Sequence, residues 1–191
     1  KEYRALGDQW GIAESLFQLA RLDLDTGQFT SALEGMQAVN RIYRERGDRR
    51  HQAETLSMLG FTHMDLGHLE DADRLHRESL SQYQEIGHRF DLDWCQANLA
   101  RTLLWQGNLE EADQLAGDSL THAQEFGRQN DEINAYLTIC GVQIYAGQYA
   151  DAQTSAEDAL LLNPNNSMAH VMRAWALDFQ GDYMAAESAI K

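Results

Sequence analysis

The sequence predicts an all-α fold, a solenoid assembled from stacked pairs of antiparallel helices. This prediction rests on two series of glycines. Within each series the glycines lie 40 residues apart, and the second series has one more glycine 34 residues further on. The first series is Gly7, Gly47, Gly87 and Gly127, and the second is Gly27, Gly67, Gly107, Gly147 and Gly181. A period between 20 and 50 residues indicates a repeat architecture. Proline is also scarce, with one residue, Pro164, where about nine are average.

The segments between the glycines have the apolar spacing of α-helices. In Trp10–Asp25 and again in Phe29–Tyr43, apolar residues recur three and four positions apart along one stripe. Each segment is followed by a glycine, the residue that most easily takes the left-handed conformation in which helices end. Each period therefore predicts two helices of about 16–18 residues.

Three further positions keep the same register. Two residues after each glycine of the second series stands a bulky apolar residue, namely Phe29, Leu69, Leu109, Tyr149 and Tyr183. Five residues after the glycine stands an alanine, namely Ala32, Ala72, Ala112, Ala152 and Ala186. Seven residues before it stands a small residue, namely Ala20, Gly60, Ala100, Cys140 and Ala174. Small residues at fixed positions indicate where neighbouring helices approach closely, and Cys140 is interpreted as such a packing residue.

These registers predict one array over residues 1–191. Its parts are 1–6 (tail of a preceding repeat), 7–46, 47–86, 87–126, 127–162 and a truncated repeat 163–191. Complete arrays close with a polar-faced capping helix, and none is visible. We therefore expect a window from a longer array, or ends that are covered by a partner or a second copy.

The repeated residues resemble the tetratricopeptide repeat. The matching segments are Leu59-Gly60 with Gly67-His-Leu-Glu-Asp-Ala72, Leu99-Ala100 with Gly107-Asn-Leu-Glu-Glu-Ala112, and Asn163-Pro164. The resemblance implies a right-handed superhelix of helix pairs. The usual period of this family is 34 residues, and the 40-residue form here is similar to arrays in bacterial signalling ATPases and transcription regulators.

The resemblance also implies a concave groove lined by the first helix of each repeat. Counting back from each turn glycine gives the candidate groove residues. They are Phe17, Arg21, Leu24, Phe61, Met64, Trp94, Arg101, Leu104, Trp105, Asn134, Leu137, Ile144, Tyr145, Val171, Trp175 and Phe179. Three of the four tryptophans fall in this set, and exposed aromatic surfaces usually bind something apolar. The alternative is that a tight superhelix buries part of the stripe as ordinary core.

The leading functional hypothesis is a non-catalytic scaffold that binds a protein or peptide segment in this groove. Trp94, Trp105 and Trp175 would be apolar anchors, and Arg21 and Arg101 hydrogen-bond donors. Acids at the rim favour a partner that also carries basic residues. One alternative is a ligand- or effector-sensing segment of a larger bacterial transcription regulator or signalling ATPase. A second is a structural scaffold that self-associates through its uncapped ends.

Composition and motifs argue against other classes of function. The formal net charge is −15, which disfavours direct nucleic-acid binding, and no apolar run is long enough for a membrane span. Seven histidines include no pair three or four residues apart, so no metal site is expected. No phosphate-binding, dinucleotide or nucleophile motif occurs, so neither an enzyme nor a cofactor is expected. The two cysteines and the lack of a signal peptide favour a cytoplasmic location.

Overall fold

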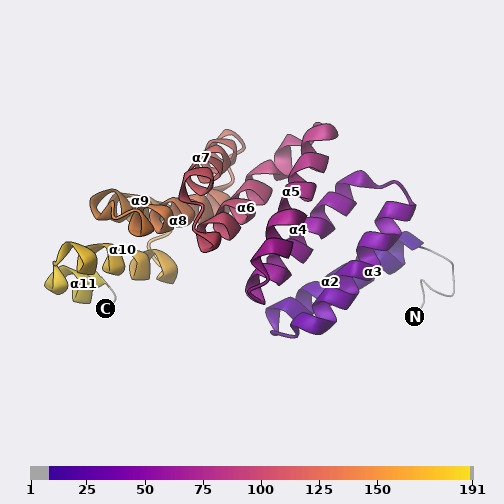
Figure 1. The fold of residues 1–191 in the computed structure, drawn as a ribbon, viewed down its shortest axis with the longest axis horizontal. Coiled ribbons are helices and arrows are strands. Elements are labelled where there is room, and N and C mark those ends of the chain that lie inside the picture. Colours follow the sequence, from indigo (N-terminus) through magenta and orange to yellow (C-terminus); the bar gives the residue numbers. More distant parts are fainter. Residues whose placement is uncertain (1–8, 190–191) are drawn as a thin grey trace. The chain divides into compact units, whose positions relative to one another are not determined.

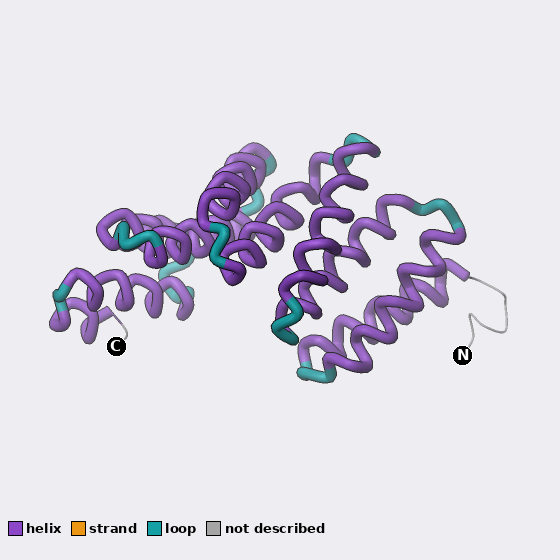
Figure 2. The backbone as a smooth tube through the Cα atoms, viewed as in Figure 1, coloured by secondary structure: helices purple, strands orange, loops and turns teal. Residues whose placement is uncertain are grey.

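The computed structural model describes residues 9–189, and within them the fold is entirely helical, as predicted (Figures 1 and 2). The helices are α2 (Gln9–Asp25), α3 (Phe29–Glu45), α4 (Arg49–Asp65), α5 (Leu69–Glu85), the 3-10 helix η1 (Arg89–Asp91), α6 (Leu92–Gln106), α7 (Leu109–Glu125), α8 (Gln129–Tyr145), α9 (Tyr149–Leu162), α10 (Ser167–Gln180) and α11 (Tyr183–Ala189). The predicted tail at residues 1–6 lies outside the described residues.

The helices fall into two compact units, unit 1 (residues 1–89) and unit 2 (residues 90–191). In unit 1, α2 packs on α3, α3 on α4, and α4 on α5. Unit 2 repeats this arrangement from α6 to α11, and α8 also packs on both α6 and α10. We call α2, α4, α6, α8 and α10 the first helices, and α3, α5, α7, α9 and α11 the second helices. The predicted repeat boundaries and the single continuous array stay predictions.

The turn glycines end the helices in the predicted way. All eight glycines of the two series that lie within residues 9–189 have positive φ, between 64° and 85°. At Gly107, for example, the backbone N–H donates to the Leu104 carbonyl (3.0 Å), and the next N–H, of Asn108, donates to the Leu103 carbonyl (2.9 Å). A Cβ on Gly107 would meet no atom within 4 Å. Its backbone conformation, rather than crowding, therefore calls for glycine.

Helix length follows the spacing of the glycines. Helices α2 to α5, α7 and α8 each have 17 residues, within the predicted length. The 34-residue interval from Gly147 to Gly181 instead holds α9 and α10, which have 14 residues each. The shorter period therefore removes about one helical turn from each helix of that interval.

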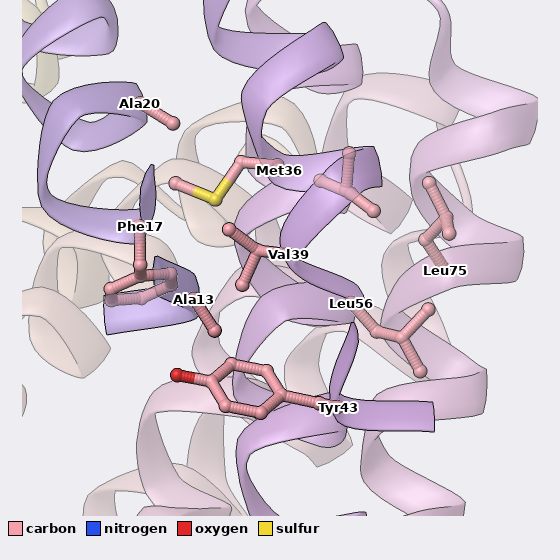
Figure 3. Close-up of a cluster of buried hydrophobic side chains, with 9 residues drawn as sticks. Ala13, Phe17, Ala20, Met36, Val39, Tyr43, Leu56 and Leu75 are labelled. Carbon is pink, nitrogen blue, oxygen red and sulfur yellow. The ribbon is translucent and has the colours of Figure 1, made fainter. Parts of the chain in front are cut away.

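Unit 1 has a core of large side chains. Phe17 of α2, Met36 and Tyr43 of α3, and Leu56 of α4 belong to one cluster in which each is at most 5% exposed (Figure 3). Burying side chains of this size contributes about 1.5–3 kcal/mol each. Met36 and Tyr43 lie two turns apart, as expected for the core-facing stripe of α3.

The core of unit 2 between α8, α9 and α10 uses small residues instead. Cys140, Ala152, Ala156 and Ala176 are fully buried there, and Met172, which is 9% exposed, completes the cluster. The Cys140 thiol donates to the Ala152 carbonyl at 3.1 Å, and burial raises its pKa to about 12. Cys140 is therefore a packing residue, as predicted, because its thiolate does not form at neutral pH.

Candidate functional site

The predicted groove residues of unit 1 lie on α2 and α4, and one of them is buried in the core rather than lying on a surface. Arg21 is exposed, whereas Leu24, Phe61 and Met64 are half-buried. Phe17 is 5% exposed and lies in the core, so its assignment to a binding surface was wrong. The stripe predicted for the groove continues on α2 into positions that face α3, and the large Phe17 ring is buried there with Met36 and Val39 (Figure 3).

In unit 2 the first helices of successive pairs, α6, α8 and α10, lie next to one another. Gly141 of α8 shows the contact directly, because a Cβ at this position would lie 2.8 Å from Leu104 Cδ2 of α6 and 3.5 Å from Met172 Cε of α10. The absence of a side chain at Gly141 lets both neighbours approach α8. The first helices of unit 2 therefore form one surface with residues at matching positions.

The predicted groove residues of unit 2 divide into two groups by exposure. The half-buried group consists of Trp94, Arg101, Leu104, Leu137, Ile144 and Val171. The exposed group consists of Trp105, Asn134, Tyr145, Trp175 and Phe179. The Arg101 guanidinium donates to the Asn98 side-chain carbonyl at 2.7 Å, so it is held against its own helix. The half-buried group forms the base of the surface, and the exposed aromatic residues are available for contact.

Three of the exposed aromatic residues occupy one repeated position, two residues before the turn glycine. We call Trp105, Tyr145 and Phe179 the aromatic row; their exposed fractions are 64%, 68% and 57%. Phe179 stacks on Tyr149 of α9, with ring centroids 5.2 Å apart and an interplanar angle of 18°. The same position in unit 1 holds Asp25 and Asp65 instead. The aromatic row is therefore a property of unit 2 rather than of every repeat.

The two units also differ in charge. Residues 1–89 contain 11 basic and 15 acidic residues, a net charge of −4. Residues 90–191 contain 4 basic and 15 acidic residues, a net charge of −11. The last turns of α6, α8 and α10, which carry the aromatic row, contain no basic residue. The aromatic surface of unit 2 therefore lies in a strongly negative environment.

An ion-pair network at the start of α6 was not predicted. Asp93 is fully buried, and its Oδ1 atom accepts hydrogen bonds from the Trp94 N–H (2.7 Å) and from Arg128 Nη1 (3.0 Å). Arg128 also donates to the Phe90 carbonyl, and its Nε lies 2.7 Å from Asp131 Oδ2. One guanidinium thus ties the start of α8 to the start of α6.

The repeat register contained the signal that identifies this network. Asp93 stands 14 residues before its turn glycine, where the other copies with the 40-residue spacing have Ala13, Ala53 and Ile133. Those three residues are at most 4% exposed. A carboxylate at a core position costs stability unless it is paired, so Asp93 implies a cation nearby. Arg128 is that cation.

The position of Asp93 predicts how stability depends on pH. Burial raises the pKa of Asp93 above its ordinary value of 3.8, and the nearby carboxylates of Asp131 and Asp91 raise it further. The Trp94 N–H and the Arg128 guanidinium lower this pKa, but they do not cancel the effect of burial. The pKa of Asp93 is therefore higher in the folded than in the unfolded state. For such a group, the stabilising contribution to the free energy of unfolding is complete below the unfolded pKa and is lost as the pH rises through the folded pKa. In Asp93→Asn, Oδ1 keeps its place as an acceptor, but the titration is removed.

The measurement is urea unfolding of wild type and Asp93→Asn at several pH values. We expect the free energy of unfolding of wild type, relative to that of the variant, to increase as the pH falls from neutral through the folded pKa. A difference that stays constant or shrinks would contradict the raised pKa. Taking the difference removes the effects of the other carboxyl groups.

The described residues show neither metal ligands in a cluster nor a membrane span. Within residues 9–189, no group of three or more His, Cys, Asp and Glu side chains is placed to hold a metal ion. None of the helices in that range is both long and apolar enough to cross a bilayer.

Antiparallel helix pairs that end at left-handed glycines and pack through small residues define an α-helical repeat protein. Family comparison makes this specific, because profiles described as tetratricopeptide repeat match residues 52–86, 94–124 and 156–188. Together these matches cover just over half of the chain, which belongs to the tetratricopeptide repeat family. A search of curated proteins found no match.

Solved structures share this fold at low sequence identity. A Rap protein complexed with competence and sporulation factor is 15% identical with a TM-score of 0.83; the alignment covers 91% of this chain and 50% of that one. The putative kinesin light chain repeats of Podosopora anserina are 17% identical with a TM-score of 0.75, covering 93% and 90%. A signal transduction ATPase with a tetratricopeptide repeat sensor, from Pyrococcus horikoshii, is 14% identical with a TM-score of 0.77, covering 98% and 30%.

Proposed function

We propose that this protein is a non-catalytic scaffold whose unit 2 binds a protein or peptide segment through the surface of α6, α8 and α10. The observation that carries the proposal is the aromatic row, Trp105, Tyr145 and Phe179. Large exposed apolar side chains gathered on one surface mark binding sites more often than isolated ones do. Tyrosine and tryptophan are also the residues most enriched among those that dominate binding energy.

The exposure of the row is not caused by a missing neighbour in the array. Trp105 lies on α6 and Tyr145 on α8, and each of these helices is followed by another first helix that packs on it. Both side chains nevertheless remain about two-thirds exposed. Trp175 is different, because the residue at the equivalent position in α8, Gly141, is buried. The exposure of Trp175 is therefore not repeated at that position of α8, and we assign Trp175 a secondary role. Trp105 and Tyr145 therefore define the proposed site.

The partner follows from the family and the charge. Tetratricopeptide repeats are generally protein-binding scaffolds, and the similar Rap structure is a complex with competence and sporulation factor. The net charge of −11 on unit 2 favours a segment that carries basic residues beside apolar anchors. The half-buried residues Leu104, Leu137 and Ile144 supply an apolar base for such anchors.

Selection from a displayed random-peptide library tests this proposal. We expect peptides selected on the wild-type chain to lose affinity by about tenfold or more for the double variant Trp105→Ala/Tyr145→Ala, because both side chains would be central contacts. Trp10→Ala is the matched control, since Trp10 is 46% exposed but lies in unit 1. Selected peptides that bind the double variant as well as wild type would refute the site. Unchanged thermal unfolding of the variants would show that the fold is intact.

A second candidate function is the sensing segment of a larger regulator. It is favoured by the similarity to the Pyrococcus horikoshii ATPase, where the matching part covers 30% of a chain described as having a tetratricopeptide repeat sensor. In that case the same surface binds a signal or another domain of the same polypeptide. Self-association through uncapped ends and a cytoplasmic location stay predictions.

A further inference from the structure

We propose that the aromatic row binds the cationic groups of Arg or Lys side chains on the partner segment, through cation–π contacts at the C-terminal ends of α6, α8 and α10. This inference rests on the proposed function and specifies its chemistry. It concerns how Trp105, Tyr145 and Phe179 bind, whereas the proposed function requires only that this surface binds a protein or peptide.

The position of the row within the helices is the first argument. Each of the three aromatic residues lies in the last turn of its helix, two residues before the glycine that ends it. The C-terminal end of an α-helix carries a partial negative charge equivalent to roughly half an elementary charge. A cation that rests against one of these rings is therefore also close to the negative end of a helix dipole.

The lack of compensating charge is the second argument. Helix C-termini are commonly stabilised by Lys, Arg or His in the last turn. No basic residue occupies the last turn of α6, α8 or α10, although Arg44 does so in α3. Asp178 adds a carboxylate to the last turn of α10. The last turns of these three helices thus lack cations of their own, and a bound cation supplies the missing charge.

The chemistry of the row is the third argument. A purely apolar anchor site is served equally well by Leu or Ile, which occupy the half-buried base of the surface at Leu104 and Ile144. The exposed positions instead hold three aromatic rings, whose faces attract cations within about 6 Å. Unit 2 already contains one such contact, with the Arg128 guanidinium carbon 4.7 Å from the Phe90 ring centroid.

The experiment compares two synthetic peptides with alternating Leu and basic positions, one with Arg and one with citrulline, its neutral isostere. Calorimetry of the full chain measures both affinities. We expect the Arg peptide to bind more tightly, and Trp105→Leu and Tyr145→Leu each to weaken the Arg peptide by roughly 3- to 30-fold while changing the citrulline peptide much less. Tyr145→Phe, which keeps the ring, should retain the affinity. Trp10→Leu is the control outside the row.

The outcomes separate this inference from the proposed function. Equal affinity of the Arg and citrulline peptides, or Leu variants that bind the Arg peptide as wild type does, overturns cation recognition but leaves an apolar binding site. Failure of the wild-type chain to bind either peptide also overturns it. The library selection with Trp105→Ala/Tyr145→Ala then decides separately whether the surface binds peptides at all.

Discussion

Replacing Phe17 with alanine is expected to reduce the free energy of unfolding by about 3–5 kcal/mol, the range found for buried phenylalanines. Phe17 is 5% exposed and belongs to the core cluster that joins α2, α3, α4 and α5. Its removal takes a large apolar ring out of contact with Met36 and Val39 and leaves a cavity (Figure 3). Urea unfolding followed by far-UV circular dichroism measures the change.

The control for Phe17→Ala is Trp10→Ala on the same helix. Trp10 is larger but 46% exposed, so its replacement should cost much less. If Phe17→Ala costs no more than Trp10→Ala, Phe17 is not a core residue. The comparison also tests the original assignment of Phe17 to a binding groove, because a groove residue would affect binding rather than stability.

Replacing Gly60 with alanine is expected to destabilise the protein by about 1–3 kcal/mol, the usual cost of overpacking. In an unstrained helix interior this substitution normally stabilises by about 0.5–1 kcal/mol, so the expected sign is reversed. The reason is the fully buried His76 of α5, whose ring atoms would lie 2.7–2.9 Å from the new Cβ. Real Cβ contacts are essentially never that short, so either the buried His76 ring or one of the two helices must shift.

Gly117 is the matched control for Gly60. It also lies inside a helix, α7, but a Cβ there would meet no atom within 4 Å, so Gly117→Ala should stabilise by about 0.5–1 kcal/mol. The double variant Gly60→Ala/His76→Ala isolates the steric effect, because the clash disappears and the double variant should be more stable than the sum of the single changes predicts. Additive effects, or a stabilising Gly60→Ala, would contradict the proposed contact.

Helix positions and helix ends were predictable from the sequence because their causes are local. The segment predicted as Phe29–Tyr43 forms α3 from Phe29 to Glu45, and Trp10–Asp25 forms α2 from Gln9 to Asp25. Both helices end where a glycine, Gly27 or Gly47, permits the left-handed conformation, which is a property of that residue alone. The register of small residues also predicted close packing at Ala20 and Cys140, which are at most 1% exposed.

The sequence by itself therefore determined the family, the helix pairs and the residues that the first helices carry. It did not decide which of those residues face solvent. Phe17 and Trp105 were assigned to the same groove stripe, yet one is 5% and the other 64% exposed. Exposure depends on side chains from other helices, such as Met36 beside Phe17, and on residues without a side chain, such as Gly141, which let neighbouring helices approach closely. The tertiary structure alone thus separated the core from the aromatic row and paired Asp93 with Arg128, because burial is set by residues distant in sequence.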